Sequence, residues 1–259
     1  MATVYDVGVD SEEEILASFI DEIPGQLAPI SLQIPESENT QDIDAQNHEF
    51  RIRLANTQER RESASILINK MYSWRGYGNS SLIEDEPNRI TLIASDNDKE
   101  VIGTISVGLD SPSLGLFADD MYHEELEELR GQGRKLCEYN RLAMDPRIKN
   151  KRVLASLFHI AFLYPWGIFG CTDGVLEVNP RHVRFYERLL GFKQIGPERV
   201  CPRVNAPSIL LRSDFAYASD QIKKLGGLMH LAEGEKSLYP YFFNTADADG
   251  ILGRLKVMA

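Results

Sequence analysis

The sequence predicts an α/β fold, more closely an α+β fold, whose helices pack on a sheet of mixed parallel and antiparallel strands. Runs of apolar residues with the two-residue period of strands recur between residues 50 and 195, and stripes with the period of helices separate them. The chain has 259 residues, of which 43% are hydrophobic, so it can bury a sizeable core. We expect an acidic extension and linker at residues 1–47, one domain at residues 48–214 and a C-terminal extension at residues 215–259.

Charge and composition exclude several classes of protein. A net charge of -11 argues against nucleic-acid binding, which needs a basic face for the phosphates. The longest apolar segment, residues 153–169, is interrupted by Ser156, His159 and Pro165, so we predict no transmembrane segment. The N-terminus lacks the basic start and apolar core of a secretory signal, and the 3 cysteines have no metal-type spacing. We therefore expect a cytoplasmic protein with reduced thiols and no metal site, of undetermined oligomeric state.

The first elements of the chain follow from its hydrophobic pattern. In the acidic extension we expect at most a short helix at residues 12–23, whose apolar side chains would form one face. Residues 50–55 alternate as a strand does. Asn56, with Glu59 following in the next turn, then predicts the N-cap of a helix that carries an apolar stripe.

The middle of the chain predicts a hairpin, a helix and a further strand. Residues 90–94 and 101–107 have strand-forming side chains and enclose a turn, so they predict an antiparallel hairpin. Residues 122–129 have apolar side chains on one helical face and a strongly acidic opposite face, which is typical of a solvated helix. Residues 136–144 predict the next strand.

The last part of the predicted domain alternates between helix and strand. Residues 153–163 are apolar almost all round, which indicates a helix buried against a sheet. A short strand at residues 175–178 precedes a helix that begins at Pro180 and ends at Gly191. Residues 192–195 resume as a strand.

The end of this element order resembles the closing half of the GNAT acyltransferases. That family has a strand, a helix that contains a Tyr, and then Leu-Gly-Phe; Tyr186 and the run Leu190-Gly191-Phe192 match this pattern. A narrower resemblance covers roughly residues 50–211, where FRIRLANTQE, ELRGQGRKLCEYNRLAMD and VNPRHVRFYERLLGF look like bacterial N-acyl amino acid synthases, relatives of the acyl-homoserine-lactone synthases. The resemblance implies a GNAT-like acyltransferase fold with N- and C-terminal extensions. It also implies an enzyme that moves a long fatty acyl chain from acyl carrier protein to the α-amine of an amino acid.

The segment before residue 153 bears on the acyl donor. Acetyl-coenzyme A users of this fold have a Gly-rich turn there, whose backbone N–H groups hold the pyrophosphate. This chain has no Gly in that turn and carries the basic side chains of Arg147, Lys149, Lys151 and Arg152, which suit the acidic surface of a carrier protein. A solvated basic turn accounts for the same residues. We expect acyl-4'-phosphopantetheine carrier protein or acyl-CoA as co-substrate, and no permanently bound cofactor.

Glu138 and Tyr186 are the predicted catalytic residues. Glu138 lies in an otherwise apolar strand, where burial raises the pKa of a carboxyl group toward that of a useful base. Three roles are open for it: the base, a ligand of the substrate amine, or the ion-pair partner of a structural Arg. Its spacing to Arg141 resembles the Glu-x-x-Arg of the lactone synthases, which implies that Arg141 binds substrate. Residues with this spacing point to opposite faces of a regular strand, so the two share a pocket only across a bulge. Tyr186 matches the GNAT Tyr that protonates the leaving thiolate, and a core position is its alternative.

Asn179, Arg181 and His182 cluster at a helix start, where N–H groups and positive charge favour an anion such as an amino acid carboxylate. Asn179 also serves as a cap, and His182 ranks below Glu138 as a base. Other activities stay open at this point. They are a coenzyme A-dependent N-acetyltransferase, a non-catalytic GNAT-like module that binds a lipid or a protein, and a lactone-forming synthase that consumes S-adenosylmethionine.

Overall fold

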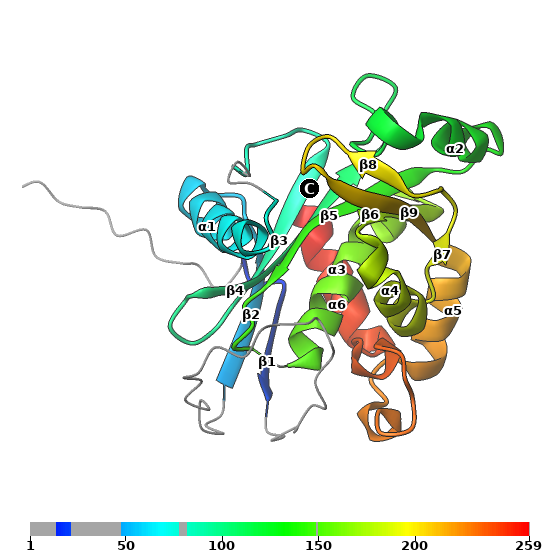
Figure 1. Ribbon diagram of the computed structural model, residues 1–259. Helices are drawn as coiled ribbons and strands as arrows, with labels where there is room; N and C mark the ends of the chain where they lie inside the picture. The colour runs from blue at the N-terminus through cyan, green and yellow to red at the C-terminus, as the bar shows by residue number, and fades with distance from the viewer. Residues whose placement is uncertain (1–13, 22–47, 78–81, 149, 259) are drawn as a thin grey trace, which may run out of the picture.

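Strands and helices alternate along the chain much as the hydrophobic pattern predicts (Figure 1). The computed structural model describes residues 14–21, 48–77, 82–148 and 150–258. The strands are β1 (Ala17–Asp21), β2 (His48–Leu54), β3 (Arg89–Ser95), β4 (Val101–Leu109), β5 (Leu136–Met144), β6 (Asp173–Val178), β7 (Lys193–Gln194), β8 (Arg199–Cys201) and β9 (Ala206–Asp214). The helices are α1 (Gln58–Trp74), α2 (Asp119–Gly131), α3 (Lys151–Phe169), α4 (Val183–Leu190), α5 (Phe215–Leu225) and α6 (Thr245–Met258), with short 3-10 turns η2 (Pro180–His182), η3 (Met229–Leu231) and η4 (Tyr239–Tyr241).

The mixed sheet that the sequence predicts is confirmed. Within the described residues the strands follow the order β1-β2-β3-β4-β5-β6-β9-β7, and β8 pairs with β9. Neighbouring strands are antiparallel except β5 and β6, which are parallel. One face of the sheet packs on the core that contains α3, α4 and α6, while α1 and α2 cover separate parts of the other face (Figure 1). Because both faces are covered, central strands such as β4 are buried at nearly every position.

The parallel strands β5 and β6 stay together only at their N-terminal ends. Their register pairs run from Leu136 with Asp173 to Glu138 with Val175, and no pair follows within the described residues. Beyond that point β5 continues along β4, whereas β6 continues along β9. We call the place where the two strands part the splay. Its two sides are residues 139–144 of β5 and residues 176–178 of β6.

The N-terminal extension forms a strand where the sequence predicts a helix. The helix expected at residues 12–23 is wrong over its described part, because β1 pairs antiparallel with β2. Ala17 and Phe19 are buried while Ser18 is exposed, which is the alternation of an edge strand. The Phe19 and Phe50 ring centroids lie 5.6 Å apart. The hydrogen bonds offered by β2 are a tertiary effect, and they override the local helical spacing of the apolar residues.

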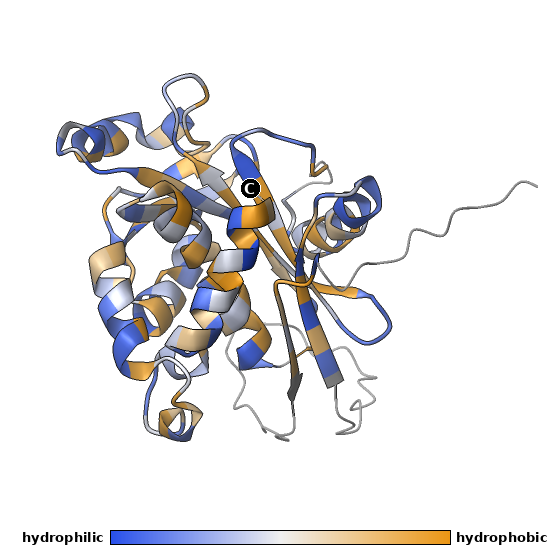
Figure 2. Ribbon diagram, turned by 180° about the vertical axis from the view of Figure 1, so that it is seen from behind, coloured by the Kyte–Doolittle hydropathy of each residue, from blue (hydrophilic) through white to orange (hydrophobic). Residues whose placement is uncertain are grey.

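The C-terminal helix α6 packs on the same core as the first strand. Leu16, Ile251 and Leu255 all belong to the buried cluster around α3. Arg254 of α6 donates to the backbone oxygen of Leu16 from Nε at 3.1 Å and from Nη2 at 2.7 Å. Figure 2, which views the molecule from behind, shows α6 running beside β1 and β2. The described part of the N-terminal extension is thus a strand of the sheet and α6 packs on the core beside it, while the divisions at residues 47 and 214 stay predictions.

Three element ends differ from the sequence predictions. The N-cap of α1 is Thr57 and not Asn56, since the Thr57 hydroxyl accepts a hydrogen bond from the Arg60 N–H. Helix α3 extends to residue 169 and ends at Gly170, whose φ of 66° is readily adopted by glycine. Among the described residues, α3 alone is long and apolar enough to span a membrane. However, 72% of its most apolar stretch is buried inside the protein. Strand β7 is shorter than expected.

Gly174 allows the close packing of β5 and β6 at the closed end of the splay. A Cβ atom at this position would lie 2.5 Å from Cε2 of Tyr139 and 2.9 Å from Cε1 of Phe215. We expect Gly174→Ala to lower the free energy of unfolding by about 1–3 kcal/mol, because the two rings have to move. Chemical denaturation measures the change. Gly131→Ala is the control, since nothing lies within 4 Å of its added Cβ, and it should stabilise by about 0.5 kcal/mol.

Candidate active site

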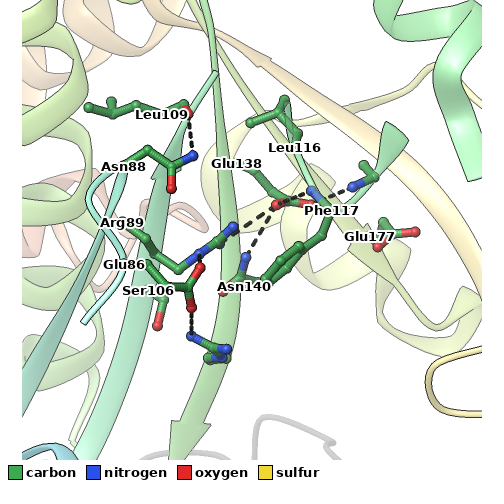
Figure 3. Close-up of polar contacts among 12 residues, drawn as sticks. Glu86, Asn88, Arg89, Ser106, Leu109, Leu116, Phe117, Glu138, Asn140 and Glu177 are labelled. Carbon is green, nitrogen blue, oxygen red and sulfur yellow. Dashed lines mark hydrogen bonds and ion pairs between the residues drawn. The ribbon is translucent and has the colours of Figure 1, made fainter. Parts of the chain in front are cut away.

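Glu138 lies at the last pair between β5 and β6 and is only 1% exposed. Its Oε2 accepts a hydrogen bond from the backbone N–H of Phe117 and its Oε1 accepts one from that of Ala118, both at 3.0 Å. The side-chain nitrogen of Asn140 donates to Oε2 at 3.3 Å. Figure 3 shows these groups converging on the carboxylate. Glu138 therefore holds the segment that leads into α2 against β5.

Arg89 of β3 supplies a positive charge beside this carboxylate. Its Nη1 lies 3.8 Å from Oε2 of Glu138, and its guanidinium carbon lies 3.8 Å from the ring centroid of Phe117. Its Nε donates to Glu86 at 2.9 Å. Burial raises the pKa of Glu138 above its ordinary value, while the Arg89 charge and the two backbone N–H groups oppose that rise. Sequence reasoning missed both Glu86 and Arg89, whose positions next to Glu138 depend on the register of β3 with β4.

The bulge that would bring Glu138 and Arg141 together is present in β5. Arg141 and Leu142 lie opposite the single β4 residue Ile105, because the register with β4 shifts there. Arg141 has a φ of 52°, in the left-handed region. Its Nη1 donates to Glu86 at 3.3 Å, in the same group of side chains that surrounds Glu138. The bulge thus places Glu138 and Arg141 on one side of the sheet.

Glu177 of β6 is a second, half-buried carboxylate that sequence reasoning missed. It follows Val175 on the same face of β6 and lies just beyond the last pair with β5. Its Oε2 forms an ion pair with Arg203, and its Oε1 is buried with no hydrogen-bond partner among the described residues. Burial raises the pKa of Glu177 to about 7. The sequence carries a signal for it, because a Glu within the apolar run VLEV stands out as Glu138 does in its own strand.

Tyr186 lies on α4 and is buried. Its ring is surrounded by three Phe rings, with centroids at 6.3 Å for Phe158, 5.1 Å for Phe185 and 5.8 Å for Phe192. Burial raises the pKa of Tyr186 above its ordinary value. The hydroxyl is therefore protonated at neutral pH, as a proton donor has to be.

The helix start after β6 has the cap that the sequence predicts. Asn179 Oδ1 accepts a hydrogen bond from the Arg181 N–H at 3.3 Å. The Arg181 side chain donates to the hydroxyl of Tyr77 at 3.1 Å and to Nε2 of His182 at 3.2 Å. Burial and the charges of Arg181 and Arg75 lower the pKa of His182 to about 4, so this imidazole is neutral. The Tyr77 contact joins the segment after α1 to the start of α4.

The basic side chains predicted to meet the acyl donor have separate neighbours. Arg147 pairs with the carboxylates of Asp145 at 2.9 Å and Glu100 at 3.3 Å. Lys151 and Arg152 each lie near an aromatic ring, at 5.9 Å and 4.6 Å from its centroid. Lys149 lies outside the described residues.

The N-terminus of α3 is capped by a side chain. Asn150 Oδ1 accepts hydrogen bonds from the backbone N–H groups of Arg152 at 2.8 Å and Val153 at 3.4 Å. In a phosphate-binding helix start these first N–H groups point at the anion. Here the Asn150 side chain occupies two of them.

Comparison with known proteins gives a consistent set of similarities. The family model described as the N-acyl amino acid synthase FeeM matches residues 63–214. The solved structure of FeeM, an N-acyl amino acid synthase from uncultured soil microbes, is 28% identical, covers 66% of this chain and 93% of that chain, and has a TM-score of 0.58. Escherichia coli ElaA is 10% identical over 64% of this chain and 99% of that chain, with a TM-score of 0.47, a likeness too distant to bear on function. No match was found among curated proteins.

Proposed function

Because the chain belongs to the FeeM family of N-acyl amino acid synthases and is an N-acyltransferase, we propose that it joins a long-chain fatty acyl group, donated by acyl carrier protein in the cytoplasm, to the α-amine of an amino acid. In this reaction a C–N bond forms at the thioester carbonyl as the C–S bond breaks. The products are an amide and the free thiol of the donor. Such a transfer needs a base for the amine, donors that polarise the carbonyl and a proton for the leaving thiolate.

The capped start of α3 is the observation that favours a carrier protein over coenzyme A as the donor. The pyrophosphate of coenzyme A would need the backbone N–H groups of Arg152 and Val153, which already donate to Asn150. Carrier protein presents its phosphopantetheine without that pyrophosphate, and its acidic surface suits Lys151 and Arg152.

The splay supports a division of roles during acyl transfer. We assign the polarisation of the thioester carbonyl to backbone N–H groups at the bulge around Arg141, and protonation of the leaving thiolate to Tyr186. Glu138, both of whose carboxylate oxygens accept hydrogen bonds from backbone N–H groups, acts by positioning Phe117 and the start of α2 beside the splay. As a base or amine ligand Glu138 would have to serve while it also holds these two N–H groups.

Arg181 is the residue that we assign to the carboxylate of the amino acid. It is exposed and lies in the turn η2 just before α4, with Asn179 as the cap of that turn and neutral His182 beside it. Arg75 also lies close enough to this turn for its charge to lower the pKa of His182. Two guanidinium groups near one another favour an anionic ligand.

The activity is tested by incubating the purified protein with acyl carrier protein loaded with fatty acyl chains of graded length and with each amino acid in turn. Mass spectrometry of the products should show an N-acyl amino acid. The same chains attached to coenzyme A should give a much lower kcat/KM. Failure to form an acylated product with either donor overturns the proposed activity, and equal use of both donors overturns the assignment of the carrier protein.

Removing the positive charges at the start of α3 gives a second test of whether acyl carrier protein or acyl-CoA is the donor. We expect the double variant Lys151→Ala/Arg152→Ala to raise the KM for acyl carrier protein by about 5- to 10-fold, because peripheral charges steer association. Its kcat and its kinetics with acyl-CoA should stay the same. Lys223→Ala/Lys224→Ala on α5 removes the same charge from an exposed site and serves as the control. An equal rise in KM for both double variants would show an effect of net charge alone.

A further inference from the structure

Glu177 occupies the point on β6 where that strand leaves β5. Glu138 is the register partner of Val175, and side chains alternate along β6, so Glu177 and Glu138 point to the same face of the sheet. Figure 3 shows the Glu177 carboxylate beside Phe117 on this face. Glu177 therefore faces the region where the two strands have parted, and Glu138 lies at its closed end.

Three elements turn charged or titratable groups toward Glu177. Arg203, in the turn between β8 and β9, forms the ion pair with Oε2. Glu138 approaches from β5, and Asp120 and Tyr122 approach from α2. Arg203 is shared, because it also donates to Asp120 at 2.7 Å. Glu177 thus lies in a group with more negative than positive charge.

The second oxygen of Glu177 has no donor. Oε1 is buried, and no described residue donates a hydrogen bond to it. A buried carboxylate oxygen in this state is unusual in folded proteins and points to a ligand or a proton that completes it. By contrast, both oxygens of Glu138 accept hydrogen bonds from backbone N–H groups. Of the two carboxylates, Glu177 is the one with an oxygen that accepts no hydrogen bond from a described residue and can accept one from an ammonium group.

We propose that Glu177 is the catalytic base that deprotonates the ammonium group of the acceptor. This inference rests on the proposed N-acyl transfer. The Glu177 carboxylate takes one proton from the ammonium group and later releases it to solvent. The free amine attacks the thioester carbonyl, the C–N bond forms and the C–S bond breaks. The nitrogen loses a second proton as it becomes an amide, and the thiolate gains one as it leaves as a thiol.

The titration of Glu177 suits this role. Burial raises its pKa to about 7, the charges of Glu138 and Asp120 add to the rise, and Arg203 opposes it. A general base is most effective when its pKa lies near the working pH. The kcat of the wild-type enzyme should therefore fall as the pH drops through about 7, because the carboxylate is then protonated.

The kcat of Glu177→Gln, measured against pH with acyl carrier protein as donor, tests the proposal. We expect a loss of about 100-fold at pH 7, since the amide cannot accept the proton. The loss should shrink as the pH rises above neutrality, because a growing fraction of the amino acid is then already the free amine. Glu177→Asp should keep the acid limb of the profile at a reduced rate. Asp120→Asn is the matched control, because it also removes a carboxylate partner of Arg203.

Two kinetic results overturn the proposal. One is a kcat for Glu177→Gln within about threefold of wild type at pH 7. The other is a loss of kcat for Glu177→Gln that is the same at every pH and equal to the loss for Asp120→Asn. Such a loss would show that Glu177 only holds Arg203 in place. Carbon-13 NMR of labelled Glu carboxyl groups gives a readout without turnover. A signal that titrates near 7 should be present in wild type and absent in Glu177→Gln.

The two proposals can fail separately. If the NMR signal shows an ordinary carboxyl pKa for Glu177, the proposal that Glu177 is the base is overturned, whether or not the enzyme acylates an acceptor. If the wild-type enzyme acylates no acceptor, the proposed function is overturned.

Discussion

Replacing Tyr186 with Phe should lower kcat about 100-fold, because the leaving thiolate loses its proton donor. The substitution removes only the hydroxyl, and the ring keeps its contacts with Phe158, Phe185 and Phe192. Burial holds the pKa of this hydroxyl above its ordinary value, so the wild-type group is protonated across the neutral range. The KM for the amino acid should stay within about threefold, since the lost interaction forms only as the C–S bond breaks. Steady-state kinetics with acyl carrier protein measure both constants.

The leaving group offers a direct control for this assignment. An aryl thioester releases a thiolate of low pKa that departs without a proton, so the deficit of Tyr186→Phe should almost vanish with that donor. Tyr164→Phe removes a hydroxyl from another buried Tyr, on α3, and should leave kcat unchanged. An undiminished deficit with the aryl thioester would assign Tyr186 to core packing alone.

Replacing Glu138 with Ala should lower the free energy of unfolding by about 3–5 kcal/mol. The backbone N–H groups of Phe117 and Ala118 would lose their acceptor, and the nearby guanidinium of Arg89 would be left with less compensation in a buried place. These stranded partners cause most of the loss, because burial itself disfavours the Glu138 charge. Urea denaturation monitored by circular dichroism measures the change.

A solvated carboxylate on α2 provides the comparison for Glu138. Glu127 is 53% exposed and pairs with Arg130, so Glu127→Ala should change the free energy of unfolding by less than about 1 kcal/mol. Glu138→Gln should fall between the two Ala variants, since its amide keeps one acceptor oxygen. If Glu138→Ala and Glu127→Ala prove equally stable, Glu138 does not hold the start of α2.

The hydrophobic pattern of the sequence predicted the order of elements from β2 to α4. Helices α1 and α4 bury one face, whereas β4 and α3 are apolar and buried on nearly all sides. The helix start predicted at Pro180 is the start of the 3-10 turn η2, and α4 begins three residues later at Val183. Gly191 marked the end of α4 correctly, since its backbone preference is local. The N-terminal helix was wrong for the opposite reason. Whether residues 17–21 form a strand depends on the free edge of β2, which lies far away in the sequence.

The site was predictable only where a single residue carries its own signal. Glu138 stands out in an apolar strand, and Tyr186 lies in a recognisable helix. Arg89 meets Glu138 only through the registers of β3, β4 and β5, which no local pattern encodes. The left-handed conformation of Arg141 is likewise set by its pairing with β4. Glu177 had a signal of the same kind as Glu138, but its unpaired oxygen and its neighbours appear only in the fold.

The contact between Arg254 and Leu16 can form only late in the synthesis of the chain. Its two residues are 238 positions apart, so Leu16 leaves the ribosome long before Arg254. Strand β1 can pair with β2 early, but the guanidinium that binds Leu16, the residue before β1, does not yet exist at that time. Contacts of such separation form late and slow the final step of folding. Strand β1 is therefore made before the other described strands of the sheet, but its neighbour Leu16 gains its contact with Arg254 only after α6 has been made.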